Sequence, residues 1–246
     1  MLNWPEQGIL SVVVPVCNEA ENVDPLAREV DAALGALGAY ELIFVDDGST
    51  DETAARVRSL RPALPAVRLL RHDCRCGQSR AVASGVRAAR GDWVATLDGD
   101  GQNDPADLTL LLDALASAAE PKPALVIGNR VTRRDTWLRR VSSRVANGVR
   151  GRLLGDGTPD TGCGLKLFHR ATFLQLPFFD HMHRFLPALF QRQGTGVISV
   201  PVGHRPRTRG QSKYGVGNRL WVGIVDLFGV MWLRARFRPG LGITEE

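Results

Sequence analysis

Asp98 and Asp100 are the residues whose type and spacing most directly suggest chemistry. They follow an apolar run, Trp93 to Leu97, that predicts a buried strand, and they precede Pro105, which suits the first turn of a helix. In an open α/β sheet, ligands bind in the crevice at the carboxyl ends of the strands. Mg²⁺ is typically held by one or two carboxylates together with substrate phosphates. The loop therefore predicts a divalent-cation site, to which Gln102 offers a further oxygen.

Polar clusters also follow two other predicted strands. Asn18 and Glu19 come after the run Ile9 to Val16, and the cluster Asp-Asp-Gly-Ser of residues 46–49 comes after the run Tyr40 to Val45. Parallel strands end at one edge of a sheet, so three polar strand ends predict a single ligand crevice. The sequence lacks the P-loop pattern G-x-x-x-x-G-K-[ST], and no G-x-G-x-x-G follows the first strand. These two nucleotide-binding classes are therefore excluded.

The elements that must position these loops alternate between strands and helices as far as residue 128. Apolar residues at three- and four-residue spacing predict a helix that ends before Gly38, and further helices over 52–60, 77–89 and 106–118. Two more strands are predicted over 67–70 and 124–128. Ser49 or Thr50 suits the N-cap of the second helix, and Asp104 that of the fourth. The alternation predicts an α/β protein with a mostly parallel sheet and helices on both faces.

The net charge of +5 is concentrated in the second half of the 246-residue chain. Residues 130–152 contain eight Arg against one acid, and residues 205–238 contain seven Arg and one Lys against one acid. Two basic patches predict an anionic partner, such as phosphate, nucleic acid or an anionic membrane surface. A basic nucleic-acid-binding protein explains the Arg residues but not the acidic strand ends, which would repel phosphate without a metal. We therefore expect no nucleic-acid partner.

The four cysteines show no disulfide or zinc framework, because the pair Cys74 and Cys76 lacks a second pair at metal spacing. His181 and His183 likewise have no carboxylate or Cys at ligand spacing. The first residues do not resemble a signal peptide, and no apolar run reaches the roughly 18 residues needed to span a bilayer. These features predict a cytosolic chain, or one bound to the inner face of a membrane.

Several segments carry a family resemblance. VPVCNEAEN (14–22), VDDGSTD (45–51) and LDGDGQ (97–102) resemble family 2 glycosyltransferases of the GT-A fold. The resemblance extends to DTGCGLK (160–166) and RTRGQSKYG (207–215), and covers roughly residues 8 to 235. The branch resembled is the polyprenyl-phosphate sugar synthases, such as dolichol-phosphate mannose synthase. Cys17 and Cys163 depart from the residues common in this family. Many members of the family also continue into transmembrane helices.

The resemblance implies an inverting transferase that moves a sugar from a nucleotide donor to polyprenyl phosphate. The nucleotide pocket would be lined by Pro15, Asn18, Glu19, Asp47 and Asp98. Mg²⁺ or Mn²⁺ would be held by Asp98, Asp100 and Gln102. The acceptor phosphate would be contacted by Arg130, Arg139, Ser143, Arg207, Ser212 and Lys213. The catalytic set would comprise Asp98, Asp100, Arg130 and Arg207.

The chemistry of the acceptor separates the possible reactions. A lipid phosphate is already an anion, so it needs positive charge to seat it rather than a strong base, and Arg supplies this charge bidentately. A related transferase acting on a hydroxyl of a polysaccharide or glycolipid would need a general base, for which Asp160 lies in a matching region. A sugar nucleotidyltransferase is a further alternative, but its basic glycine-rich loop after the first strand is absent.

The end of the chain predicts a membrane-interface tail over 216–246, after a GT-A catalytic domain over 1–215 with a nucleotide half (1–128) and an acceptor half (129–215). Leu220 to Leu233 is nearly all apolar but too short to span, and Trp221, Trp232 and the Arg residues that follow suit an interfacial amphipathic helix. Residues 137–154 show a second amphipathic pattern. Residues 205–217 suit a mobile loop. We expect a peripheral enzyme on the cytoplasmic face of the cell-envelope membrane, helped by a small transmembrane partner or by self-association.

Overall fold

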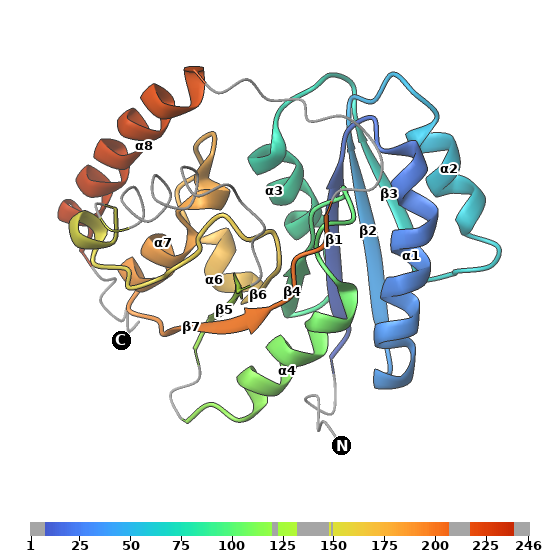
Figure 1. Cartoon of the computed structure of the whole chain (residues 1–246), viewed down its shortest axis with the longest axis horizontal. Helices are drawn as coiled ribbons and strands as arrows, with labels where there is room; N and C mark the ends of the chain where they lie inside the picture. Colours follow the sequence, from blue (N-terminus) through green and yellow to red (C-terminus); the bar gives the residue numbers. More distant parts are fainter. Residues whose placement is uncertain (1–7, 120–122, 132–147, 149, 207–216, 239–246) are drawn as a thin grey trace, which may run out of the picture.

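The computed structural model describes residues 8–119, 123–131, 148, 150–206 and 217–238. Its strands are β1 (Leu10–Val16), β2 (Tyr40–Asp47), β3 (Val67–His72), β4 (Trp93–Thr96), β5 (Leu125–Arg130), β6 (Lys166–His169) and β7 (Val197–Val202). In the described residues they form one sheet in the order β3-β2-β1-β4-β6-β5-β7. Figure 1 shows helices on both faces of this sheet, which confirms the predicted fold class.

Two helical layers cover the sheet. One layer comprises α1 (Ala20–Leu34), α2 (Thr53–Leu60) and α4 (Leu108–Ala116), and the other comprises α3 (Gln78–Ala88), α6 (Arg170–Leu174) and α7 (Leu186–Arg192). Three short 3-10 turns are η1 (Gly35–Leu37), η2 (Pro105–Asp107) and η3 (Met182–Arg184). The last described helix, α8 (Gly217–Ala235), packs against α7 (Figure 1).

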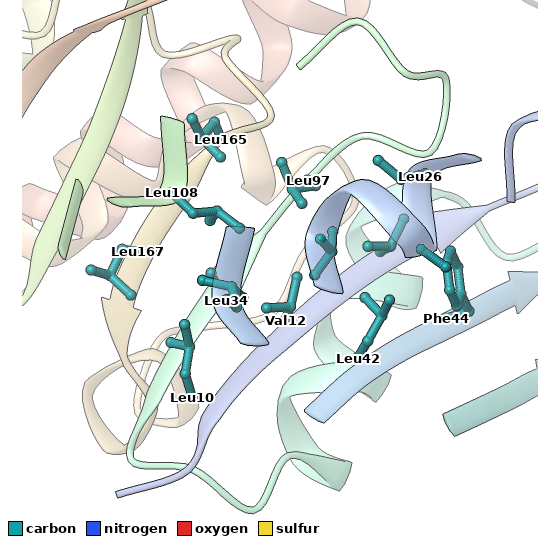
Figure 2. Packing of buried hydrophobic residues seen from close by; sticks show 14 of the residues in the cluster. Leu10, Val12, Leu26, Leu34, Leu42, Phe44, Leu97, Leu108, Leu165 and Leu167 are labelled. Atoms are coloured by element: carbon teal, nitrogen blue, oxygen red, sulfur yellow. The ribbon is translucent and has the colours of Figure 1, made fainter. Parts of the chain in front are cut away.

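The strand pleat divides the core between these layers. Val12 and Phe44 pack in the cluster beneath α1 and α4 (Figure 2), whereas Val13 and Ile43 pack in the cluster beneath α3 and α7. Successive side chains on a strand point to opposite faces, so a strand covered on both sides reads as a continuous apolar run. Each fully buried aliphatic side chain contributes about 1.5–3 kcal/mol. This burial holds the strand ends, and therefore the loops that follow them, in fixed positions.

The order of the strands adds a feature that the sequence did not predict. The pairs β1–β2, β2–β3 and β1–β4 are parallel, as predicted, but β5 does not lie beside β4. Instead β6 lies between them and runs antiparallel to both, and β7 pairs in parallel with β5. Neither β6 nor β7 was expected from the sequence. The reversed direction matters because it brings the first residue of β6, Lys166, opposite Thr96 at the edge where β4 ends.

The helix caps confirm one prediction and correct another. Asp104 accepts a hydrogen bond from the backbone N–H of Ala106 at 3.0 Å, as expected, although the helix starts there as the 3-10 turn η2. The second helix begins at Thr53, whose N–H donates to Asp51 at 3.0 Å. Ser49 and Thr50 do not cap it. Both instead bind Asn18 across the loops that follow β1 and β2.

The helix predicted near the C-terminal end is present as α8, and apolar side chains lie on both its buried and its exposed sides. Val230 is buried, while Ile224, Val225, Phe228 and Trp232 are exposed. Asp226, which interrupts the apolar run, lies 3.2 Å from His181, the residue before η3. Among the residues that the structure describes, no helix is both long enough and apolar enough to cross a bilayer.

Candidate active site

The predicted site residues converge at one edge of the sheet. The ends of β1, β2 and β4 lie there because these strands are parallel neighbours, and the start of the antiparallel β6 joins them. A cavity of about 130 Å³ opens at this edge. It is lined by Pro15, Gln78, Val82, Thr96, Leu97, Asp98, Gly162, Gly164, Lys166, His183, Arg184 and Leu186.

Asn18 and Glu19 join the loop after β1 to the loop after β2. The Asn18 backbone N–H donates to Ser49 Oγ at 2.8 Å, and the Asn18 side-chain oxygen accepts from the Thr50 N–H at 2.7 Å. The Glu19 backbone N–H donates to Thr53 Oγ1 at 2.9 Å. Asn18 adopts a φ of 49°, a left-handed conformation that Asn tolerates better than most residues. These contacts place both residues at the predicted edge, and their nucleotide contacts stay predictions.

Asp47 is buried and anchors the loop between β3 and α3. One carboxylate oxygen accepts from the Cys76 N–H and the other from the Gly77 N–H, each at 2.8 Å. His72 Nδ1 lies 2.8 Å from the first oxygen. A carboxylate with two backbone donors is fixed in orientation, so Asp47 holds the start of α3 in place. Its predicted contact with the nucleotide is not tested by these bonds.

The loop after β4 holds its two carboxylates close together. Asp98 accepts a hydrogen bond from Gln78 Nε2 at 2.8 Å, and Asp100 accepts one from the Gln102 N–H at 3.2 Å. Gly164 packs so tightly that a Cβ there would lie 2.3 Å from the Asp98 carboxylate. Burial, and then the charge of Asp100, raises the pKa of Asp98.

The Asp98–Asp100 pair fits a hard divalent cation. A cation beside the buried Asp98 would stabilise the ionised carboxylate that burial and the charge of Asp100 disfavour, and both side chains offer only oxygen ligands. The Gln102 carbonyl accepts from the Arg205 N–H at 2.9 Å, so the backbone of Gln102 has a defined place in this loop. The role of its side-chain oxygen as a third ligand stays a prediction.

Basic groups lie near Asp98, where the charges of Lys166 and Arg130 partly offset the rise of its pKa. Lys166 is buried, its ammonium group donates to the Cys163 carbonyl, and burial lowers its pKa. Arg130 makes a bidentate pair with Asp160, from Nε at 2.7 Å and from Nη2 at 2.9 Å. The Asp160 carboxylate therefore neutralises Arg130. It was the candidate general base of the hydroxyl-acceptor alternative.

His183 is held in orientation by Ser79 beside the cavity. Its backbone N–H donates to Ser79 Oγ at 3.3 Å, and the same Oγ lies 2.7 Å from His183 Nδ1. In the tautomer in which the Ser79 hydroxyl donates to Nδ1, the ring proton lies on Nε2. Burial, followed by the charge of Lys166, lowers the pKa of His183 well below its usual value. The imidazole therefore stays uncharged at neutral pH.

Several predicted acceptor residues lie outside the described residues: Arg139, Ser143, Arg207, Ser212 and Lys213. Arg205, just before the second group, is described and ties its segment to the metal loop. Its guanidinium lies 2.6 Å from Asp104 and 2.6 Å from Glu29. Arg205 therefore lies at the loop that carries the carboxylate pair, in contact with Asp104 and the Gln102 carbonyl.

Arg150 does not contribute to the exposed basic patch that was predicted over residues 130–152. It is largely buried, lies 3.4 Å from Asp156 and donates to the Thr158 carbonyl at 2.7 Å. Burial lowers its pKa. Arg150 therefore stabilises the turn at 156–161 rather than facing an anionic partner. The rest of the predicted helix 137–154 lies mostly outside the described residues.

Several residues in or beside the cavity had no predicted role. Gln78 follows a glycine at the start of α3, and Lys166 ends the quoted segment 160–166. Ser79 is visible only through its contact with His183, which is distant in sequence. Lys166 could have been predicted as a site residue, because burying a Lys in an otherwise apolar strand is unfavourable unless its charge has a partner or a function.

Residues 11–176 match the family described as Glycosyl transferase family 2, and the chain belongs to this family. It is 38% identical to the dodecaprenyl-phosphate galacturonate synthase of Rhizobium johnstonii, over 97% of this chain and 71% of that protein. It is 34% identical to the undecaprenyl-phosphate 4-deoxy-4-formamido-L-arabinose transferase of Edwardsiella ictaluri, over 84% of this chain and 63% of that protein. Both relatives are polyprenyl-phosphate sugar transferases by name, which confirms the predicted branch.

Solved structures confirm the predicted GT-A-like fold. Glucosyl-3-phosphoglycerate synthase from Mycobacterium tuberculosis, in complex with Mn²⁺, UDP and phosphoglyceric acid, superposes with a TM-score of 0.70. The two sequences are 21% identical, and the alignment covers 94% of this chain and 80% of that one. A complex of the same enzyme with Mg²⁺ and UDP gives a TM-score of 0.69, with 97% and 83% covered. At this identity the likeness establishes the fold alone.

Proposed function

We propose that this glycosyltransferase moves a sugar, with inversion, from a nucleotide-sugar donor to polyprenyl phosphate. The observation that carries the proposal is the charge of the cavity wall. Among its described lining residues Asp98 is the one carboxylate, and it lies in the metal loop, while Lys166, His183 and Arg184 supply positive charge or N–H donors. Such a wall suits an anionic acceptor.

The hydroxyl-acceptor alternative is disfavoured by the state of Asp160. A general base must accept the proton of the attacking hydroxyl, which requires an accessible lone pair and a pKa near the working pH. The Asp160 carboxylate is 7% exposed and receives both Nε and Nη2 of Arg130. A bidentate guanidinium stabilises the carboxylate and lowers its basicity. An acceptor that is already ionised removes the need for a base.

The reaction then divides between two groups of residues. An oxygen of the acceptor phosphate attacks the anomeric carbon as the bond from that carbon to the diphosphate breaks, and the nucleoside diphosphate leaves with the electron pair. Asp98 and Asp100 would hold the Mg²⁺ or Mn²⁺, which neutralises the leaving diphosphate. Arg130, Lys166 and Arg184 seat the acceptor phosphate, and the neutral His183 offers an Nε2–H to the substrate. Pro15, Asn18, Glu19 and Asp47 position the nucleotide.

We also propose roles for residues whose contacts with the site the structure does not describe. Arg139, Ser143, Arg207, Ser212 and Lys213 complete the acceptor-phosphate site, with Arg207 in the catalytic set and Gln102 as a metal ligand. The catalytic domain spans 1–215, with a nucleotide half to residue 128 and an acceptor half beyond it. The position of Arg205 supports this, because Arg205 precedes Arg207 by two residues in the sequence and is held on Asp104, in the loop after β4.

The lipid acceptor calls for a membrane-facing surface, and we assign it to residues 216–246. The exposed apolar side chains of α8 are Ile224, Val225, Phe228 and Trp232, and Arg236 follows them. A helix with apolar and basic faces binds a membrane surface in proportion to its buried apolar area and its attraction to anionic lipid. The enzyme would act on the cytoplasmic face as a peripheral protein. A small transmembrane partner, or self-association through α8, would complete the lipid path.

The test is product identification. The purified chain is incubated with Mn²⁺ or Mg²⁺, vesicles containing polyprenyl phosphate, and each of a panel of nucleotide sugars, and lipid-linked products are identified by mass spectrometry. The proposal predicts a glycosyl phosphate lipid with one donor and release of the nucleoside diphosphate. Sugar transfer only to a hydroxyl compound in the same vesicles would contradict it.

A further inference from the structure

The loop between β3 and α3 carries two thiols that the proposed reaction does not use. Cys74 and Cys76 are both exposed, and their sulfur atoms lie 3.8 Å apart. Asp47, His72 and Cys76 each offer one ligand atom, and these three atoms lie within 4.8 Å of one another. Three potential ligand atoms of O, N and S type therefore lie together beside the end of β2, and the Cys74 thiol lies next to one of them, Cys76 Sγ.

The spacing of these atoms matches one class of ion. A tetrahedral Zn²⁺ with Zn–S bonds of about 2.3 Å holds two thiolates about 3.8 Å apart. Thiolate and imidazole ligands select zinc-like ions, whereas the oxygen-only pair Asp98 and Asp100 suits Mg²⁺ or Mn²⁺. We propose that Asp47, His72, Cys74 and Cys76 form a binding site for a thiophilic divalent ion such as Zn²⁺, separate from the metal loop after β4.

The backbone around the site is already fixed. Asp47 receives the N–H groups of Cys76 and Gly77, each at 2.8 Å. Gly48 has a φ of +69°, and a Cβ there would lie 2.6 Å from the Arg75 nitrogen, so the thiol-bearing loop packs directly on the end of β2. Preorganised ligands lose little conformational freedom on binding. Only the two exposed thiol side chains need to rotate.

His72 has the outer contact that metal-binding histidines commonly show. Its Nε2 lies 2.9 Å from Ser84 Oγ, which directs Nδ1 toward Asp47 and the thiols. On binding, the ring proton that Nδ1 donates to Asp47 would move to Nε2, which would donate it to Ser84 Oγ, and His72 would coordinate through Nδ1. Each thiol would lose its proton to solvent as a metal–sulfur bond forms. Binding therefore releases two protons from the cysteines and changes no oxidation state.

The experiment uses Co²⁺ as a spectroscopic substitute for Zn²⁺. The metal-free full chain, kept reduced with a phosphine and verified by thiol titration, is titrated with Co²⁺ while thiolate-to-cobalt charge-transfer absorption is recorded. One equivalent per chain should give this absorption, and Zn²⁺ should abolish it by displacement. The band should persist in the Asp98→Asn/Asp100→Asn chain, so the result is independent of the proposed transfer reaction.

Variants assign the ligands. The Cys74→Ser/Cys76→Ser double variant should lose the band, and His72→Gln should weaken Co²⁺ binding about 10- to 100-fold. Cys17→Ser is the matched control and should bind like the parent chain; circular dichroism checks that each variant is folded. The proposal is overturned if the reduced parent chain gives no band, if the double variant keeps it, or if Cys17→Ser removes it.

Discussion

The two sides of the cavity differ in charge and in how the chain builds them. The acidic side is Asp98, which lines the cavity, and Asp100, both in the short loop that follows β4. The basic side is Lys166, His183 and Arg184, which line the cavity, and Arg130, whose charge acts on Asp98; these residues are drawn from β5, β6 and η3. One short segment supplies the first set, and the tertiary fold assembles the second.

The difference corresponds to the two ends of the transfer. The acidic side includes Asp98, whose pKa is raised by burial and by the charge of Asp100 and lowered in part by Lys166 and Arg130. In the proposed reaction this side holds a divalent ion and, through it, a diphosphate. The basic side presents donors directly, and its acid, Asp160, is neutralised by Arg130. In the proposal a metal therefore stabilises the leaving group, and side chains seat the attacking group.

The largest effect is expected at the acidic side. Asp98→Ala and Asp100→Ala should each lower kcat by several kcal/mol of transition-state stabilisation, on the order of 10³-fold. Asp113→Ala, an exposed acid on α4, is the control and should be neutral. Steady-state transfer assays with and without chelator measure this. Full activity in either variant, or in excess chelator, would mean that transfer does not depend on a metal ion held by Asp98 and Asp100.

The basic side should respond through the acceptor. Arg130→Ala should raise the KM for lipid phosphate by roughly 10- to 150-fold, the loss of a charge-assisted contact worth about 1.5–3 kcal/mol. Nucleotide affinity, measured by calorimetry, should be nearly unchanged. If nucleotide affinity collapses in a folded variant, Arg130 belongs to the donor side.

Asp160→Asn sharpens the same test, because it keeps the shape of the pair and removes the charge. A general base at this position would cost about 10²- to 10⁴-fold in kcat when lost. We expect less than about tenfold. Arg130→Lys serves as a second variant, since removing one partner of a buried pair costs about 3–5 kcal/mol of stability. Thermal unfolding identifies any variant whose activity is lost with its fold.

The helix α8 packs against α7, whose residue Leu186 lines the cavity, so membrane docking should favour the acceptor. Phe228→Glu should reduce binding to anionic vesicles about tenfold, by removing part of a buried aromatic contribution of about 1.5–3 kcal/mol. Leu174→Glu, a comparably exposed leucine on α6, is the control. Sedimentation with vesicles measures both. Equal loss in the two variants would mean a general charge effect.

The smallest effect at neutral pH concerns the stability contributed by His183. Its lowered pKa means that the unfolded chain binds a proton more readily, so stability is full above about pH 6.5 and falls as pH decreases below it. The slope attributable to one such group is at most about 1.4 kcal/mol per pH unit. His183→Gln should flatten the fall below pH 6.5 in denaturant unfolding. An unchanged slope would mean that His183 titrates normally in the folded chain.

Sequence reasoning predicted the acidic side better than the basic side for a physical reason. β1, β2 and β4 are apolar runs ending in polar clusters, and parallel pairing alone brings those ends together. In contrast, β6 is only four residues long and its direction is set by pairing with β4 and β5. A short strand in a polar context carries little periodicity. Both the strand and the place of Lys166 were therefore missed.

The other contacts of the site could not be predicted because they join residues that are far apart in the sequence. Asp160 pairs with Arg130, 30 positions away, and Ser79 with His183, 104 positions away, and neither spacing is a motif. The prediction that Ser49 or Thr50 caps the second helix was wrong, because three neighbouring side chains are able to cap it. Ser49 and Thr50 both bind Asn18 instead, and Asp51 accepts from the Thr53 N–H. The sequence shows which side chains can form hydrogen bonds, but not which residue each of them binds.

The most direct measurement compares polyprenyl phosphate with polyprenol of the same chain length as acceptors in otherwise identical vesicles. Initial rates are recorded with the accepted nucleotide sugar and saturating Mn²⁺. The account predicts transfer to the phosphate and at least about a 10³-fold slower rate with the alcohol, because no base activates a hydroxyl and the phosphate contacts are lost. Comparable rates with the two acceptors would contradict the division of labour between the acidic and basic sides.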